Sequence, residues 1–228
     1  MKKTIILAAA IIIAGCMLPI AVSKYKSYDR TVDVRGLCER EVKADKVIWP
    51  LTYKVVNDEL NAAMSQTDKY NDEIVAFLKA GGIKDSEISI SPSVINDKLA
   101  NEYGNNDRVY RYLCTNVITV CTDNVDAVLK LRNNQGELLK KGIPLTESWE
   151  NHTEFRFEAL NDIKPEMIAE ATEGARAAAL KFANDSQSHL GKIQKASQGV
   201  FSIEDRDSNT PEIKKVRVVT SVTYYLSR

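Results

Sequence analysis

The chain has 228 residues with a globular composition: 44% are hydrophobic and 27% are charged. The 31 lysine and arginine residues balance 31 aspartate and glutamate residues, so the formal net charge at neutral pH is zero. Because a nucleic-acid-binding protein carries an excess of basic side chains, nucleic acid is not an expected partner. With 10 glycines and 6 prolines, the chain is also unlike collagen, a mucin-like stalk or a largely disordered protein.

Residues 1–30 are predicted to lie outside the fold. Two lysines precede an uncharged, apolar run from Thr4 to Val22, which is just long enough to span a membrane and is long for a secretory signal. The segment Ile13-Ala14-Gly15-Cys16 resembles a bacterial lipobox, so Cys16 is a candidate for lipidation. An uncleaved inner-membrane anchor, a lipoprotein and a cleaved signal all remain open. Each of them places residues 31–228 in the bacterial cell envelope, facing the periplasm.

The first half of the chain changes from a strand pattern to a helical pattern and back. A short strand is expected from Val32 to Cys38, and residues 47–56 form a longer strand with one apolar face. Within it, Pro50 favours a sheet edge or a bulge. Helical spacing begins at Leu60 and stops at Gly81-Gly82. The remaining elements expected in this half are a strand over 88–94, a polar loop over 96–107 and a strand over 108–122.

The second half is expected to repeat this order around a longer helix. Lys164-Pro165-Glu166 opens that helix, since proline is tolerated in a first helical turn, and the helix ends at His189 to Gly191. The elements expected around it are a short helix over 123–132, a polar connector ending at Gly142, a strand over 145–160 and strands over 192–203 and 213–226.

The order strand, long helix, strand, strand thus occurs twice, at 42–122 and at 145–226. This pattern predicts an α+β fold of two βαββ-like halves, in which antiparallel sheets pack against long helices behind an N-terminal hydrophobic anchor. The folded domain is expected to cover residues 31–228, with lobes of about 31–142 and 143–228.

Several blocks of sequence also carry a family resemblance. They are Val34-Arg35-Gly36 through Glu39-Arg40-Glu41-Val42 and Ala44-Asp45, residues 164–171, the alanine-rich run 175–183, Leu190-Gly191-Lys192-Ile193 and the last strand over 216–226. Together they are similar to the SIMPL-domain family over about residues 31–226. The resemblance implies a bacterial periplasmic protein associated with oxidative-stress defence, with two α+β lobes that assemble into oligomers and no catalytic residues. The chain departs from the commoner family pattern at Cys38 and at Ala44.

The long helix shows a stripe of mostly small residues. Ile168, Ala171, Ala175, Ala178 and Phe182 recur at spacings of three and four, so they are expected to form its buried face. Small side chains let a helix approach its sheet, and the pattern predicts close packing, with a subunit interface as the alternative. The residues expected to form the structural motif are Trp49, Lys164, Pro165, Glu166, Ala171, Ala175, Ala178, Phe182 and Gly191.

No catalytic, cofactor-binding or metal site is predicted. His152 and His189 are far apart and lack a cysteine or second histidine at ligand spacing, and His152 is expected to face solvent. Cys114 and Cys121 lie seven apart on opposite faces of one predicted strand, too distant to bond each other. A disulfide from Cys38 to either of them and buried free thiols both remain open. The motifs of serine hydrolases, zinc proteases and nucleotide-binding loops are absent from the sequence.

The sequence therefore favours a membrane-tethered, periplasm-facing protein that acts by binding or assembly, without a cofactor. The leading hypothesis is an envelope-stress or scaffold protein that works as a homo-oligomer. The alternative is an envelope hydrolase or thiol redox enzyme whose site, built from Cys38, Cys114 or a carboxylate cluster, is assembled only by folding. An enzyme would show polar side chains converging in a pocket, and an assembly protein an exposed apolar patch or strand edge.

Overall fold

The computed structural model describes residues 15, 30–100, 110–146 and 150–227, and they form two compact units. Unit 1 contains the described residues up to Glu41 together with Leu160–Glu204 and the chain from Lys215 onward. Unit 2 contains Val42–Ala159 and Asp205–Lys214. Each unit is therefore built from segments that are distant in the sequence.

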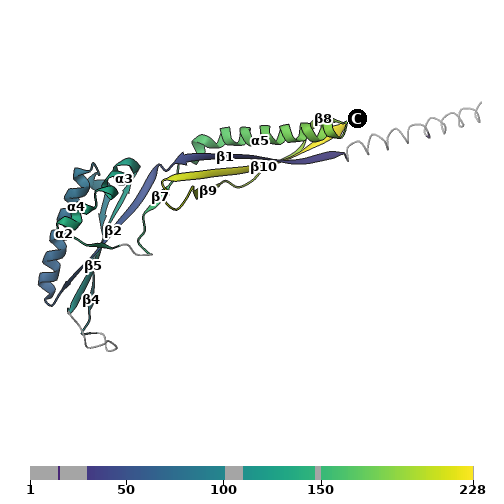
Figure 1. The fold of residues 1–228 in the computed structure, drawn as a ribbon. Coiled ribbons are helices and arrows are strands. Elements are labelled where there is room, and N and C mark those ends of the chain that lie inside the picture. The colour runs from purple at the N-terminus through teal and green to yellow at the C-terminus, as the bar shows by residue number, and fades with distance from the viewer. Residues whose placement is uncertain (1–14, 16–29, 101–109, 147–149, 228) are drawn as a thin grey trace, which may run out of the picture. The chain divides into compact units, whose positions relative to one another are not determined.

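Unit 1 is a long helix, α5, on a sheet of strand order β1-β10-β8, with β9 also paired to β10. Figure 1 shows α5 lying along β1 and β10. Burial alternates along both strands, and Val34 of β1 packs with Val222 and Tyr224 of β10 against the helix. The elements are β1 (Thr31–Lys43), α5 (Leu160–Asp185), β8 (His189–Gln198), β9 (Ser202–Asp205) and β10 (Ile213–Ser227).

Unit 2 is a sheet of strand order β3-β5-β2-β6, with β4 paired to β5 and β7 paired to β2. The odd-numbered residues of β2 from Val47 to Val55 are all buried in a core that includes Ile74, Leu78 and Val128 of the helices, which confirms the predicted apolar face. The elements are β2 (Lys46–Asn57), α2 (Leu60–Ala80), the 3-10 turn η1 (Asp85–Glu87), β3 (Ile88–Ile90), β4 (Val94–Asp97), β5 (Tyr112–Thr122), α3 (Val125–Asn133), α4 (Gly136–Lys140), β6 (Leu145–Thr146) and β7 (Glu154–Arg156).

Pro50 lies in the long strand β2 at a place where its missing N–H does no harm. On one side it is opposite Thr119 of β5. On the other side β7 pairs with β2 up to Ile48 and β6 pairs from Thr52, so among the described residues Pro50 faces a gap between two short strands. β2 is otherwise a central strand, and Pro50 lies between the stretches that pair with its two short partner strands.

The division into units differs from the lobes expected at 31–142 and 143–228. The strand expected over 145–160 is two short strands, β6 and β7, and both pair with β2 in unit 2. Phe155 of β7 lies opposite Val47 and is buried in the core of unit 2. Because β7 gains its burial beside β2, it does not join the sheet that carries α5, and the second βαββ order is not one lobe.

Both ends of α5 differ from the predicted ends. The helix begins at Leu160, so Pro165 lies inside it and costs one backbone hydrogen bond instead of occupying the first turn. The helix ends at Asp185 because Gln187 has a φ of 53°. The Gln187 and Ser188 N–H groups then donate to the Asn184 and Ala183 carbonyls (3.0 and 2.8 Å), which closes a Schellman motif.

The N-terminal predictions fall outside the part of the chain that the structure describes. The tether at residues 1–30 and the lipidation candidate Cys16 lie there, apart from Gly15 and Arg30. Within the described ranges, no helix is both long and apolar enough to cross a membrane.

Candidate functional site

The tightest backbone packing in unit 1 occurs at Gly36, where β1 meets α5. A Cβ atom built on Gly36 would lie 1.7 Å from the Ala171 carbonyl oxygen and 2.6 Å from the Ala175 amide nitrogen. Real Cβ atoms do not approach backbone atoms so closely, so every residue other than glycine would push the helix away from the strand. Gly36 therefore explains why the facing residues of α5 are alanines.

The buried face of α5 contains Ala171 and Ala175, as predicted, but its other residues differ from the predicted stripe. Phe182 is 58% exposed, so its place in the buried face was predicted wrongly, and Ala178 is only partly buried. The buried residues of α5 instead recur every four positions. Each step of four residues turns about 40° around a helix, so a row with this spacing winds around α5 and follows the twist of the sheet below it. A stripe of alternating threes and fours runs straight and leaves the twisted sheet at its ends. The buried row is Met167, Ala171, Ala175, Ala179 and Ala183.

The predicted motif residues do not form one site. Trp49 is buried in the core of unit 2, whereas the others belong to unit 1. Lys164 lies over the ring of Phe201, with 5.9 Å from Nζ to the ring centroid, and Pro165 is exposed. Gly191 lies in an irregular stretch of β8, where a Cβ atom would approach the Tyr225 carbonyl oxygen to 2.9 Å.

Cys38, Arg40, Glu166 and Glu170 form a polar cluster between β1 and α5. The Arg40 guanidinium donates to Glu166 Oε2 (2.8 Å) and to Glu170 Oε2 (3.1 Å). Burial, together with a hydrogen bond to Glu170, raises the pKa of the Cys38 thiol, while that bond and Arg40 lower the pKa of Glu170. A thiol with a raised pKa is a poor nucleophile because its reactive form is the thiolate. The cluster therefore favours a structural role over thiol chemistry.

The other two described cysteines lie on opposite faces of β5, as predicted. Cys114 is buried and Cys121 is exposed, and Cys38, Cys114 and Cys121 are all free thiols. Burial also raises the pKa of Cys114. The thiol redox hypothesis thus finds no support at the two cysteines that were its candidates.

This geometry predicts the order in which the three thiols react. A soluble alkylating agent at pH 8 should modify Cys121 within minutes, whereas Cys38 and Cys114 should react only after unfolding. Peptide mass spectrometry with and without denaturant, without reductant, measures both steps. Recovery of a disulfide-linked peptide containing Cys38 would contradict the free-thiol assignment and restore the redox hypothesis.

A buried polar network joins α2 to the sheet of unit 2. The Tyr53 hydroxyl donates to Asn71 Oδ1 (2.7 Å) and lies 3.0 Å from the Thr67 carbonyl oxygen. Asn116 Nδ2 donates to the Tyr53 hydroxyl and to Asn71 Oδ1, each at 3.1 Å. Burial raises the pKa of Tyr53 to about 12, against the opposing effect of the Asn116 hydrogen bond. The network links α2 to β2 and β5, which indicates that it aligns the helix with the strands, although the buried Asn116 Oδ1 has no hydrogen-bond partner among the described residues.

Tyr53 should make the protein lose stability in alkali. The unfolded tyrosine loses its proton near pH 10, whereas the folded one keeps it up to about pH 12. The unfolded state thus binds fewer protons in this window, and the free energy of unfolding should fall by about 2 to 3 kcal/mol between the two values. Urea titrations of the wild type and Tyr53→Phe at pH 9.5 and 11.5 measure it. Equal pH slopes for the two proteins would show that Tyr53 does not titrate differently on unfolding.

The two histidines are not brought together with other metal ligands. His152 is exposed in unit 2, which confirms its predicted orientation. His189 is the first residue of β8, not part of a helix end, and its carbonyl accepts a hydrogen bond from the Ser227 hydroxyl (3.4 Å). Within the described ranges, no group of three or more histidine, cysteine and acidic side chains could hold a metal ion.

An open groove of about 460 Å³ lies between α5 and β8. Leu180 and Ile193 line it and are 43% and 49% exposed, and Tyr224 forms part of its floor. It exists because α5 covers β1 and β10 and leaves the same face of β8 open; nearly all of β8 is exposed. The sequence pattern did not predict this groove, although Leu180 is an apolar residue of α5 outside the predicted stripe and Ile193 is an apolar residue of β8. The lining residues are Thr172, Arg176, Leu180, Leu190, Gly191, Lys192, Ile193 and Tyr224.

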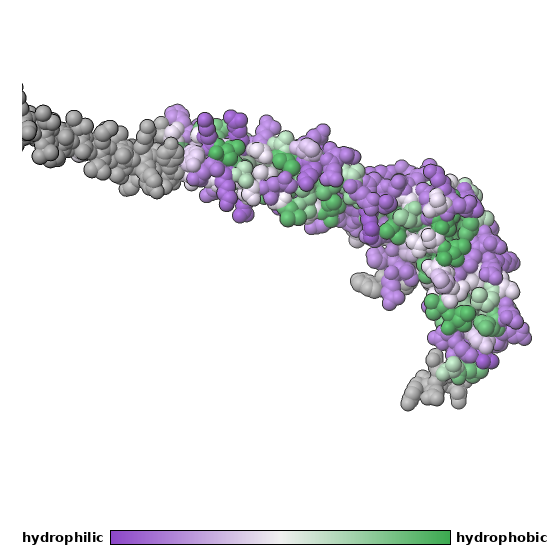
Figure 2. All heavy atoms as spheres, turned by 180° about the vertical axis from the view of Figure 1, so that it is seen from behind, coloured by the Kyte–Doolittle hydropathy of each residue, from purple (hydrophilic) through white to green (hydrophobic). Residues whose placement is uncertain are grey.

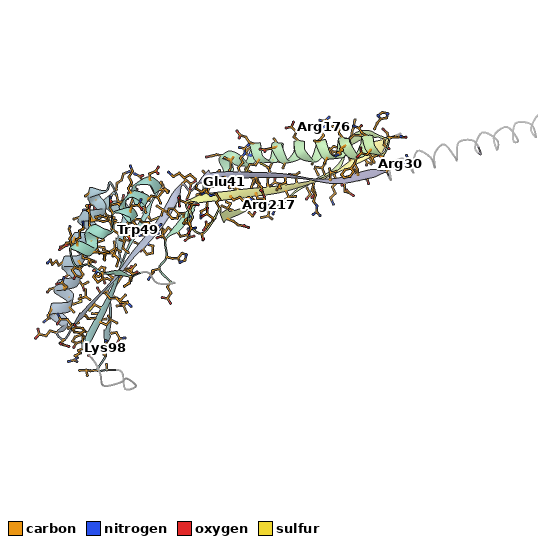
Figure 3. The ribbon with its side chains drawn as sticks, viewed as in Figure 1. Arg30, Glu41, Trp49, Lys98, Arg176 and Arg217 are labelled. Carbon is orange, nitrogen blue, oxygen red and sulfur yellow. The ribbon has the colours of Figure 1, made fainter. Side chains whose placement is uncertain are left out.

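Figure 2 shows that apolar side chains reach the surface in small groups between hydrophilic ones. In Figure 3, Arg176 of α5 and Arg30, which precedes β1, lie toward the same end of unit 1. The groove itself is lined by apolar residues together with Arg176 and Lys192, and its lining residue Leu190 lies opposite Leu226, which is hydrogen-bonded to Arg30.

Comparison with known proteins identifies one family. The family model for SIMPL, described as a protein of unknown function, matches residues 32–224. This range contains Gly36, the buried row of α5 and the groove beside β8. No curated protein matches the chain. The family description names no activity, so the match carries no catalytic residue over to this chain.

Proposed function

The chain belongs to the SIMPL family, and from that premise we propose that it is a membrane-tethered protein of the bacterial periplasm that works as an oligomeric scaffold or binding protein in the response to envelope or oxidative stress. Its action is assembly and binding, without catalysis and without a cofactor. Thr4 to Val22 provides the tether, as an inner-membrane anchor or as a lipoprotein signal.

The observation that carries the assembly part of this proposal is the pair of open edges in unit 1. In the strand order β1-β10-β8, neither β1 nor β8 has a described strand on its outer side. The first of these edges runs over Thr31–Lys43 and the second over His189–Gln198. Unpaired N–H and C=O groups along such lengths are a template for pairing with another chain. A sheet that continues from one copy to the next would satisfy both edges.

The polar clusters support a role outside catalysis. Arg40 is held by two glutamates, and Glu39 on the open face of the sheet is paired with Lys215 (2.9 Å) and Arg217 (3.3 Å). These are surface ion pairs whose partners satisfy one another, and they leave no poised acid, base or nucleophile. The buried Tyr53 network likewise joins helix to strand by side-chain hydrogen bonds.

Crosslinking in intact envelopes tests the assembly. Cells that produce the full chain are treated with an amine-reactive crosslinker, and the products are identified by mass spectrometry after purification in detergent. We expect a ladder of species that contain this chain alone, and mass photometry of the detergent complex should give a single multiple of the protomer mass. A monomer in both measurements would overturn the oligomer, and a ladder made only with a second protein would replace it by a hetero-complex.

The tether makes a separate prediction at Cys16. Cys16→Ala should leave the protein in the membrane fraction after alkaline carbonate extraction, because the apolar run from Thr4 to Val22 is untouched. Intact mass spectrometry of the wild type should then show an unprocessed N-terminus. A mass that begins at residue 16 and carries a diacylglyceryl group would contradict the anchor and identify a lipoprotein.

A further inference from the structure

The groove between α5 and β8 is lined by both apolar and basic side chains, which indicates a ligand with an apolar part and an anionic part. Leu180, Leu190 and Ile193 offer an apolar wall along its length, over a floor that includes the ring of Tyr224. Arg176 and Lys192 line the same groove and are exposed. An apolar channel with two cations beside it is complementary to an amphiphile that has an apolar chain and an anionic head.

The two groove cations differ from the paired basic residues of unit 1, and resemble Arg35, Lys181 and Lys195, in having no ion-pair partner among the described residues. Arg40, Lys215 and Arg217 each form an ion pair with a glutamate. Within the described residues, neither Arg176 nor Lys192 makes an ion pair or a side-chain hydrogen bond. Their positive charge is therefore available to a bound anion.

The groove also lies at the end of unit 1 that continues into the apolar N-terminal run. The Leu226 N–H donates to the Arg30 carbonyl (2.8 Å), and Leu226 pairs with Leu190 of β8, which lines the groove. Figure 3 shows Arg176 toward this same end. Only residues 23–29 separate Val22 from Arg30, a reach of at most about 28 Å at full extension. A membrane that holds Thr4 to Val22 is therefore within reach of the groove.

We propose that the groove between α5 and β8 binds one acyl chain of an anionic membrane phospholipid, with the phosphate-bearing head held by Arg176 and Lys192. The acyl chain lies against Leu180, Leu190 and Ile193, and its burial removes their exposed surface from water. The inference rests on the proposed tether, which brings lipid to this end of unit 1. A volume of about 460 Å³ is within the range of small-molecule sites and suits one chain better than two.

Photo-crosslinking of the full chain in nanodiscs tests this site. Phosphatidylcholine discs are doped with a phosphatidylglycerol that carries a diazirine in one acyl chain, and parallel discs carry the same chain on phosphatidylcholine. After irradiation, mass spectrometry maps the labelled peptides. We expect the phosphatidylglycerol probe to label the peptides that contain Leu180 and Ile193, and the phosphatidylcholine probe to label them several-fold less.

Charge substitutions show whether the two cations select the lipid. Arg176→Gln and Lys192→Gln should each lower groove labelling by the anionic probe about five-fold, since a basic residue near an anionic surface contributes about that factor. Lys195→Gln is the matched control. It removes the same charge from the same strand, but Lys195 pairs with Thr223 and lies on the opposite face of the sheet. It should change labelling less than about two-fold.

Three results would overturn the lipid site: equal labelling by both probes, labelling unchanged in the Arg176→Gln, Lys192→Gln double variant, or a groove occupied by a second copy, seen as crosslinks between chains. The tether is judged separately. Labelling within Thr4 to Val22 without groove labelling would keep the tether and reject the lipid site. Extraction of the protein by alkaline carbonate, combined with groove labelling in vesicles, would reject the tether and keep the site.

Discussion

Gly36→Ala is expected to be the most damaging single-methyl substitution in unit 1, with a loss of about 3 kcal/mol or more in the free energy of unfolding. The added methyl group would overlap the Ala171 carbonyl oxygen and the Ala175 amide nitrogen, at 1.7 and 2.6 Å. Both are backbone atoms, so no side-chain rotation relieves the overlap, and α5 must move away from β1. Thermal and urea unfolding of the full chain, followed by circular dichroism, measure the loss.

Gly174→Ala is the matched control, because it makes the same chemical change on the other side of the contact. A Cβ atom there would lie 4.0 Å from the Gly36 Cα, an ordinary van der Waals distance. Since alanine favours the helix over glycine by up to about 1 kcal/mol, this variant should be as stable as the wild type or slightly more stable. If Gly36→Ala melts like the wild type, the contact between β1 and α5 is looser than these distances imply.

Ala175→Leu is expected to cost about 3 kcal/mol, near the upper end for overpacking. Ala175 lies on the buried face of α5, opposite the backbone of Gly36. A larger side chain therefore has no space there unless the helix moves. For a chain of this size the melting temperature should fall by about 6 to 12 °C. Melts of the full chain in detergent give the value directly.

Ala177→Leu supplies the comparison on the same helix. Ala177 is exposed and lies about 200° around the helix from Ala175, so its enlargement should change stability by less than about 0.5 kcal/mol. If both variants melt like the wild type while Ala175→Leu alone gives a smaller assembly in size-exclusion chromatography, Ala175 belongs to a subunit interface, and the core assignment is wrong.

The sequence predicted correctly those helices and strands that are specified by the residue pattern of their own segment. The strand β2 was predicted from its alternation, and α2 from helical spacing that starts at Leu60 and stops at Gly81-Gly82. Gly82 has a φ of 93°, which explains why the helix cannot continue past it. The α+β class follows from the same signals, because a change of period marks each change of element.

The predictions that failed depended on contacts between distant segments. Phe182 was placed in the buried face because a straight stripe was assumed, whereas the twist of the sheet selects a winding row. Likewise, the short strand β7 was assigned to the second half, but its partner is β2, more than a hundred residues earlier in the chain. Neither outcome is visible in a local pattern, since both depend on which surface a segment meets.

The sequence by itself determined the family, the mixed α+β composition and the small residues of the long helix. These follow from residue types at short spacings, because helices and strands each impose their own period on the apolar residues of the sequence. Only the tertiary structure decided that Gly36 meets the backbone of α5 and that the chain crosses four times between its two units. It also left one face of β8 uncovered, with Arg176 and Lys192 beside an apolar groove. The physical reason is that strand pairing and helix packing depend on the total apolar surface that the fold removes from water. That total includes contacts between segments from every part of the chain.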